Sequence, residues 1–263
     1  QAGCHVLCEK PMATTVADCQ RMIEAAAQAE RRLLIGMQRR YAPVYREAFR
    51  LLQEGAIGDV KFMNLVEYRG DWAKKSKDPE EDRRINWRYR QDLSGGTMLE
   101  KSTHFFDVFS WFAGGNATQV CGTGGLNVYS HRDTLDHAAI SVRYPGEITV
   151  GHTLTLYSVD HVRFFDVLGT EGHLRVYYDD GRVELFDRKH RREPVVIEPT
   201  DHPEWRTLRR HSGTPEMYDA LVAHIRAGTA PSASGEAGLE AVRVGVAAEQ
   251  AIRTGTTVSI QTT

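Results

Sequence analysis

The first 55 residues alternate between short apolar runs and amphipathic runs, and this alternation constrains the possible folds more than any other feature. The apolar runs HVLCEKP (5–11) and RLLIGMQ (32–38) are typical of buried strands. Apolar residues at helical spacing follow each run, first from Val16 to Ala27 and then between Pro43 and Gly55. Strand, helix, strand and helix in this order predict a parallel sheet with a right-handed crossover.

A different pattern begins near Gly58. A strand-like run at 59–70 precedes a charged run at 73–84, which we predict to be a loop. Six further β-rich runs occupy residues 119–185, and turn sequences at 144–147 and 179–181 predict mostly antiparallel pairing. Helical spacing recurs at 97–112, 217–228 and 238–253.

The fold class that these patterns predict is α/β plus α+β. Residues 1–58 are interpreted as the carboxyl-terminal remnant of a parallel Rossmann sheet. Residues 59–263 are interpreted as a larger mixed, mostly antiparallel sheet domain with helices on one face.

Composition excludes several classes of protein. Lys and Arg number 33 against 35 Asp and Glu, so no strong field attracts nucleic acid. No apolar run approaches the roughly 20 residues that a membrane helix needs. Four cysteines in 263 residues suggest reduced thiols, and we expect a cytoplasmic protein with no nucleic-acid or membrane partner.

The run GGTMLEKSTHFFDVF (95–109) predicts a helix with one polar stripe. Glu100, His104 and Asp107 fall within about 60° of one another at 100° per residue, while the phenylalanines occupy another sector. A histidine flanked by carboxylates at i−4 and i+3 can have its pKa raised and act as a general base.

Structural explanations of the same residues stay open. Thr97-x-x-Glu100 matches a capping box, in which Glu100 bonds backbone donors at the helix start. His104 is also consistent with a core histidine, and Asp107 with the partner of a nearby arginine.

A second candidate element is Glu9-Lys10-Pro11, at the carboxyl end of the first predicted strand. Open α/β sheets bind ligands at that edge, so Lys10 is available to a substrate hydroxyl. The proline indicates an unusual turn with a candidate cis bond, and the alternative is an exposed loop lysine.

No metal site is expected, because the sequence lacks H-E-x-x-H and paired Cys motifs. The run HRDTLDH (131–137) is interpreted as a polar loop or a strand start, with a ligand role for His131, Asp133, Asp136 and His137 as the alternative.

Several motifs in consistent order resemble the Gfo/Idh/MocA family of nicotinamide-dependent oxidoreductases. They are CHVLCEKPMA, RLLIGMQRRYAP, WRYRQDLSGGTMLEKSTHFFDVFSWFAGG and VLGTEGHLRV, and the resemblance spans nearly the whole chain. It implies a cofactor, NAD or NADP, and a secondary alcohol of a sugar, inositol or similar polyol as hydride donor.

The resemblance also implies site residues. Lys10 and His104 match the family's lysine and histidine beside the nicotinamide and substrate, and Glu100 stands where the family motif has aspartate. The implied cofactor contacts are Glu9, Pro11, Gln38, Arg40, Trp87 and Arg88.

Two other functions remain open at this point: an NAD-dependent enzyme that cleaves glycosides, and a non-catalytic sugar or cofactor sensor of the same fold. The family's Gly-rich strand-turn-helix is not in this sequence, so we interpret the chain as truncated and expect weak dinucleotide binding by it alone. We also expect a homo-oligomer that forms through the open face of the second sheet.

Overall fold

The amino-terminal part folds as a small parallel unit. The computed structural model describes residues 2–70, 76–130, 132–187, 193–198 and 213–261. Strands β1 (Val6–Cys8) and β2 (Leu33–Ile35) pair in parallel, and helix α1 (Val16–Gln28) connects them. Thr15 caps α1, because its side chain accepts the N–H of Asp18. The predicted strand–helix–strand unit is therefore confirmed.

Nine strands of the described residues form the second sheet, in the order β10-β9-β8-β7-β3-β6-β5-β4-β11. Neighbouring strands are antiparallel except β3 and β6, which are parallel, so the mixed, mostly antiparallel sheet is as predicted. The strands are β3 (Val60–Tyr68), β4 (Gln119–Gly125), β5 (His137–Arg143), β6 (Thr149–Thr155), β7 (Val162–Gly169), β8 (Gly172–Tyr177), β9 (Arg182–Asp187), β10 (Val195–Ile197) and β11 (Val258–Ser259).

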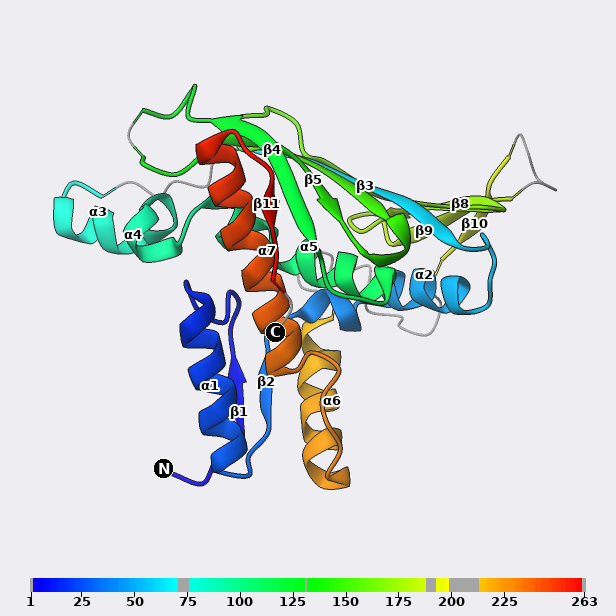
Figure 1. The fold of residues 1–263 in the computed structure, drawn as a ribbon, viewed down its shortest axis with the longest axis horizontal. Helices are drawn as coiled ribbons and strands as arrows, with labels where there is room; N and C mark the ends of the chain where they lie inside the picture. Colours follow the sequence, from blue (N-terminus) through cyan, green and yellow to red (C-terminus); the bar gives the residue numbers. More distant parts are fainter. Residues whose placement is uncertain (1, 71–75, 131, 188–192, 199–212, 262–263) are drawn as a thin grey trace.

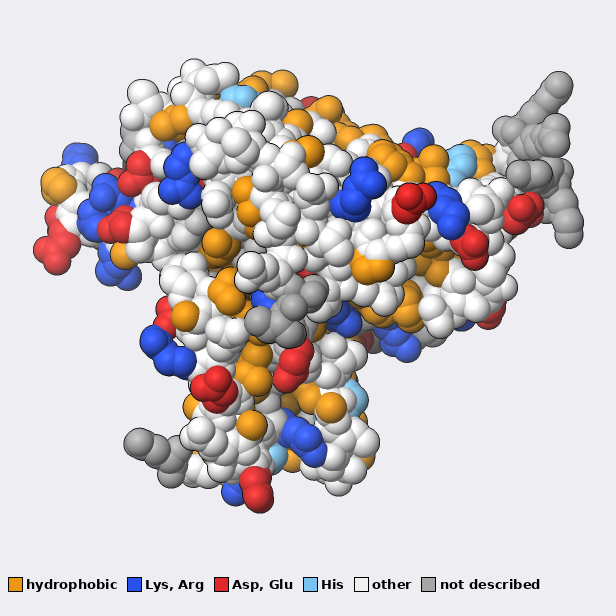
Figure 2. Space-filling model, viewed as in Figure 1, with side chains coloured by type: hydrophobic (Ala, Val, Ile, Leu, Met, Phe, Trp, Pro, Cys, Tyr) orange, Lys and Arg blue, Asp and Glu red, His pale blue; other side chains and the backbone are white. Residues whose placement is uncertain are grey.

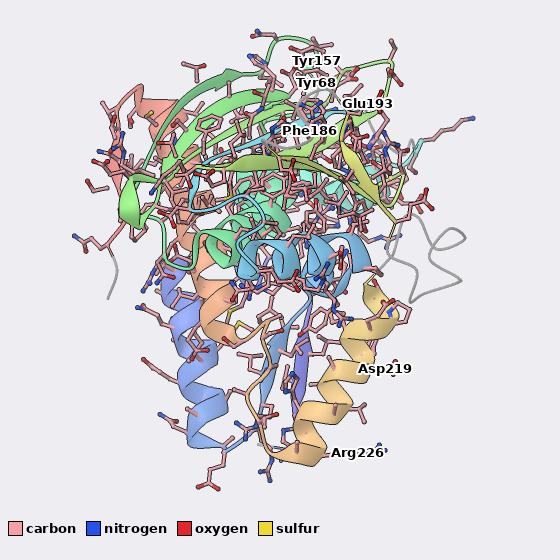
Figure 3. All side chains as sticks on the ribbon, turned by 90° about the vertical axis from the view of Figure 1, so that its right-hand side faces the viewer. Tyr68, Tyr157, Phe186, Glu193, Asp219 and Arg226 are labelled. Atoms are coloured by element: carbon pink, nitrogen blue, oxygen red, sulfur yellow. The ribbon has the colours of Figure 1, made fainter. Side chains whose placement is uncertain are left out.

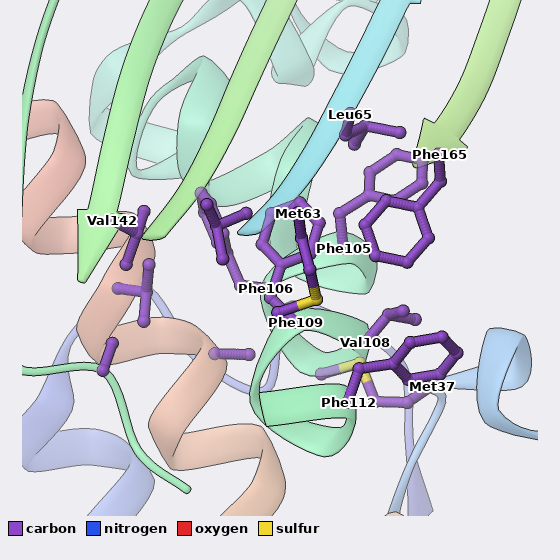
Figure 4. Close-up of a cluster of buried hydrophobic side chains, with 14 of the residues drawn as sticks. Met37, Met63, Leu65, Phe105, Phe106, Val108, Phe109, Phe112, Val142 and Phe165 are labelled. Carbon is purple, nitrogen blue, oxygen red and sulfur yellow. The ribbon is translucent and has the colours of Figure 1, made fainter. Parts of the chain in front are cut away.

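Helices cover one face of this sheet (Figure 1). They are α2 (Pro43–Gln53), α5 (Thr97–Ala113) and the upper half of α7 (Gly235–Thr254), while α6 (Thr214–Ala227) lies beside the parallel unit. The phenylalanines of α5 pack against the inner face of the sheet, where Met63 and Leu65 of β3 and Phe165 of β7 point toward them (Figure 4). The aromatic sector of α5 thus forms the core, and its polar stripe is left for another neighbour.

Alternation along β3 assigns each side chain to a face. Met63, Leu65 and Glu67 are buried on the inner face, whereas Phe62 and Tyr68 are exposed on the outer one. In Figure 2 hydrophobic side chains appear along the upper margin of the large sheet, and in Figure 3 Tyr68 lies at the end of the molecule opposite α6.

The charged run at 73–84 differs from its prediction as a loop. Residues 71–75 lie outside the described part, but Pro79–Ile85 form helix α3. Asp78 caps α3 by accepting the N–H of Glu80, and Pro79 stands at its first turn. The charges had suggested a solvated loop, yet this capping arrangement starts a helix.

The two sheets are connected by contacts that cross the predicted boundary at residue 58. The N–H of Ile35 in β2 donates to the carbonyl of Ala233, and Leu34 forms an antiparallel bridge with Ser234. Helix α7 packs on both α1 and α5, so the carboxyl-terminal segment joins the two units. The division into domains stays a prediction.

Within the described residues, no helix is both long enough and apolar enough to cross a membrane.

Glu249 of α7 binds the start of α5. Its Oε1 accepts the N–H of Met98 at 2.7 Å. The carboxylate fits there because residue 96 is a glycine: a Cβ at this position would lie 2.4 Å from the carboxylate. A carboxylate at a helix amino terminus is favourable, but burial raises the pKa of Glu249 to about 7. The folded protein therefore binds this proton more tightly than the unfolded chain.

We predict that the stability advantage of the wild type over Glu249→Gln is largest below about pH 4.5 and falls as pH rises to about 7. The loss should be about 1 kcal/mol per pH unit between pH 5 and 7, because the folded pKa lies above the unfolded one. Urea unfolding at four pH values measures it, with exposed Glu54→Gln as control. A difference that does not change with pH would contradict the assignment.

Candidate active site

Lys10 extends from the end of the first strand to helix α5. The Lys10–Pro11 bond is cis, as the sequence suggested. The ammonium donates to the carbonyl oxygen of Glu100 at 2.7 Å and lies 3.5 Å from Glu100 Oε1. Only 17% of the side chain is exposed, so Lys10 is not an exposed loop lysine.

Glu100 receives basic groups from three segments. Besides Lys10, Arg88 donates through Nε to Oε1 at 3.0 Å, and Lys101 Nζ lies 2.9 Å from Oε2. Burial opposes ionisation of this carboxyl, but the charges of Lys10, Lys101 and Arg88 lower its pKa to about 2.

The capping-box alternative for Glu100 is wrong. The N-cap of α5 is Gly96 and makes no side-chain hydrogen bond, while the hydroxyl of Thr97 donates to the carbonyl of Leu135. The carboxylate of Glu249 takes the place of a local cap. The carboxylate of Glu100 thus caps no backbone N–H group and instead pairs with the basic side chains.

His104 lies one helical turn after Glu100 and is partly exposed. Its Nδ1 is buried and has no hydrogen-bond partner among the described residues. Burial lowers the pKa of His104 well below its usual value, and the charges of Lys10, Arg39 and Arg163 lower it further. The expectation that neighbouring carboxylates raise this pKa is wrong, because both carboxylates are already paired with cations.

Asp107 is the partner of an arginine, as one alternative held. Arg40 Nε lies 2.9 and 2.8 Å from its two oxygens, and Arg40 Nη2 lies 2.7 Å from Oδ1. Burial raises the pKa of Asp107 and Arg40 opposes that rise. The pair fixes the segment after β2, the 3₁₀ turn η1 (Gln38–Tyr41), against α5.

The residues expected to contact the cofactor differ in their surroundings. Glu9 is exposed after β1, and Gln38 opens η1 directly after β2, so both lie where the parallel strands end. Arg88, in the 3₁₀ turn η2 (Trp87–Tyr89), binds Glu100 and stacks on Trp87, while Arg40 is held by Asp107. Their contacts with a cofactor remain predictions, as do those of Pro11.

Four further charged residues close to this site were not anticipated. Glu67 lies on the inner face near the end of β3, Arg69 follows that strand, and Arg163 lies near the start of β7. Arg69 Nη1 and Arg163 Nη1 lie 3.4 and 3.6 Å from Oε1 of the buried Glu67. Arg39 comes from η1. The alternation in NLVEYR could have placed Glu67 and Arg69 on the face of Leu65. That Arg69 comes near Glu100 depends on how α5 packs against the sheet.

A hollow of about 410 Å³ lies at the opposite end of the polar stripe, lined by Arg40, Phe49, Trp111 and neighbouring residues of α2 and α6. It includes neither Lys10 nor His104, so the chemistry-bearing residues gather elsewhere.

The run at 131–137 contains a residue with a structural role, Asp136. His131 lies outside the described residues, but Asp136 accepts the backbone N–H groups of Asn127, Val128 and Tyr129 and contacts His137. This carboxylate holds a loop in shape.

Comparison with known proteins identifies the family. A model described as "Oxidoreductase family, C-terminal alpha/beta domain" matches residues 50–260. The chain belongs to the Gfo/Idh/MocA oxidoreductase family. The companion model, described as "Oxidoreductase family, NAD-binding Rossmann fold", matches residues 1–37, so the resemblance found in the sequence is confirmed and the family's cofactor is a nicotinamide dinucleotide.

Three relatives show the range of this Gfo/Idh/MocA member's similarity. A 1-carboxy-3-chloro-3,4-dihydroxycyclohexa-1,5-diene dehydrogenase of Comamonas testosteroni is 33% identical over 74% of the chain and 46% of its own length. Myo-inositol 2-dehydrogenase of Thermotoga maritima is 24% identical over 98% of the chain and 73% of its own. The structure of aldose-aldose oxidoreductase from Caulobacter crescentus, with glycerol bound, has a TM-score of 0.79 at 28% identity and covers 98% of this chain and 72% of that one. The chain thus spans about half of the Comamonas enzyme.

Proposed function

We propose that the protein is an NAD- or NADP-dependent dehydrogenase that oxidises a secondary alcohol of a sugar, inositol or related polyol. The observation that carries the proposal is the bond from Lys10 to the Glu100 carbonyl, which holds an ammonium one helical turn from a partly exposed, unpaired imidazole. The substrate class is supported by the names of two relatives, a myo-inositol 2-dehydrogenase and an aldose-aldose oxidoreductase.

His104 has the protonation state that a general base requires. Its lowered pKa keeps the imidazole neutral at pH 7, so it can accept the hydroxyl proton of the substrate. The cofactor, which Glu9, Gln38 and the Trp87-Arg88 turn would help to hold, supplies the hydride acceptor when bound.

Lys10 provides the complementary charge. An ammonium has three N–H donors, and the Glu100 carbonyl takes one at short distance, so a donor remains for the substrate oxygen. There it would stabilise the negative charge that develops as the proton leaves. Glu100 positions Lys10, and its side chain also binds Arg88 and Lys101.

We expect His104→Ala and Lys10→Ala each to lower kcat/KM at least 100-fold, since base and oxyanion contacts commonly contribute roughly that much. The assay follows nicotinamide reduction by the intact protein with a polyol panel. The matched controls are Lys61→Ala, which is exposed on β3, and His224→Ala, which is partly exposed on α6. If both site variants stay within about threefold of the wild type, the assigned roles fail. Substrate turnover without net reduced cofactor would instead favour glycoside cleavage.

The pH dependence follows from the same charges. Because His104 acts deprotonated and its pKa is lowered, kcat/KM on a neutral polyol should stay level from pH 8 to about 6.5 and decline only below that. Burial also lowers the pKa of Lys10, so loss of its proton should limit the rate below pH 10.5. An acid limb centred at or above pH 6.5 would contradict the role of His104.

We also propose that the outer face of the large sheet pairs with a second copy of the chain. Phe62, Tyr68 and Leu168 are each more than a third exposed on that face. Phe62→Asp should reduce the particle mass in sedimentation, whereas Val222→Asp on α6, equally apolar and exposed, should not. An unchanged mass for Phe62→Asp would exclude this face.

A further inference from the structure

Apart from the Arg40–Asp107 pair, basic groups outnumber acidic groups in the cluster formed around Glu67, Glu100 and His104. Among the described residues, six basic side chains meet three carboxylates, Glu67, Glu100 and Asp179, which leaves an excess of three positive charges. The exposed Glu9 beside Lys10 reduces the excess to two. The basic side chains are Lys10, Arg39, Arg69, Arg88, Lys101 and Arg163.

Five of the six basic side chains have a carboxylate partner. Lys10, Arg88 and Lys101 share Glu100, while Arg69 and Arg163 share Glu67, with Asp179 as a second partner of Arg163. Arg39 is the one of the six without a hydrogen bond or ion pair to a carboxylate among the described residues, although it is near enough to Glu67 for the two charges to interact.

Arg39 is buried without an acceptor. It is 7% exposed, and its Nε and Nη1 have no hydrogen-bond partner among the described residues. The guanidinium carbon lies 4.2 Å from the ring centre of Phe105 and 4.4 Å from that of Tyr178. Stacking on aromatic rings offsets part of the cost of burying a cation, but it satisfies no N–H group.

Arg39 lies close to His104, the proposed general base. Phe105, on which it stacks, directly follows His104, and the charges of Lys10, Arg39 and Arg163 all act on the imidazole. A buried, unpaired arginine next to a general base is costly unless an anion arrives to pair with it.

We propose that the substrate carries an anionic group, a carboxylate or a phosphate, that binds Arg39 in the same site where Lys10 and His104 hold its alcohol. The inference rests on the proposed function and narrows its substrate class to anionic sugars or polyols. Arg39 would then determine specificity, because a guanidinium pairs strongly with carboxylate and phosphate oxygens. Neutral sugars or polyols of the same shape would leave Arg39 without an anionic partner.

The first experiment needs no variant. Initial rates of the intact protein are compared for glucose with glucuronate and glucose 6-phosphate, and for galactose with galacturonate. We expect kcat/KM at least tenfold higher for an anionic member, as for one charge-assisted hydrogen bond. The uronates and the sugar phosphate separate carboxylate from phosphate recognition. Equal or better use of the neutral sugar in each comparison would overturn the inference.

The second experiment tests the residue. Arg39→Met keeps the apolar length of the side chain and should bring the ratio of anionic to neutral kcat/KM close to one. Arg50→Met, a half-exposed arginine on α2, should leave that ratio unchanged. An Arg39→Met protein that retains the anion preference would exclude Arg39 as its source.

Calorimetry separates this inference from the proposed function. If no sugar reduces the cofactor, the dehydrogenase assignment fails, yet tenfold tighter binding of glucuronate or glucose 6-phosphate than glucose would still support an anion site. Equal affinities for all three would sink the anion site even if polyols are oxidised. Because this comparison uses the wild type, it stands if Arg39→Met does not fold.

Discussion

The bond between Lys10 and the Glu100 carbonyl is the contact on which the arrangement of this site depends. It joins a loop that follows a parallel strand to the first turns of a helix packed on a different sheet. The two segments are 90 residues apart in sequence, and a buried ammonium can bridge them only because a carbonyl and a carboxylate satisfy it. Removing the Glu100 carboxylate would leave the buried ammonium with a neutral carbonyl as its only hydrogen-bond acceptor among these two. The parallel unit and the large sheet are thus held in a common site by a polar contact, not only by the apolar core.

That contact also explains the electrostatics of the helix. Seen as a sequence, α5 carries two acids beside His104, and the simplest expectation is a raised pKa. In the folded protein Glu100 is neutralised by basic side chains from three segments and Asp107 by Arg40, so neither acid dominates the field at the imidazole. What remains at His104 is burial and positive charge. A neutral imidazole beside an ammonium suits removal of a proton from an alcohol whose oxygen becomes negative.

The sequence was sufficient for the parts of the structure that depend on local periodicity. The spacing after Thr15 and Pro43, and the alternation from Val60 to Tyr68, each describe one segment, and the elements agree. It failed where a short capping signal competes with charge, as at Asp78-Pro79, where a helix replaces the expected loop. The family motifs directed attention to Lys10, Glu100 and His104, but the partners of those residues come from distant segments. Arg39, Glu67 and Arg163 have no common motif, because only the packing of η1, β3 and β7 around α5 assembles them.

Arg39 and Arg40 are adjacent in sequence but differ in their partners, and this difference favours an anionic substrate. Arg40 has a bidentate carboxylate, Asp107, supplied by the protein itself. Arg39 is more deeply buried and has two nitrogens without an acceptor, although stacking on Phe105 and Tyr178 fixes its position. A structural arginine gains from a carboxylate like Asp107, since an unpaired buried charge destabilises the fold. A binding arginine has to be held rigidly by groups that do not occupy its donors, and aromatic rings do that. The surroundings of Arg39 fit the second role, and those of Arg40 fit the first.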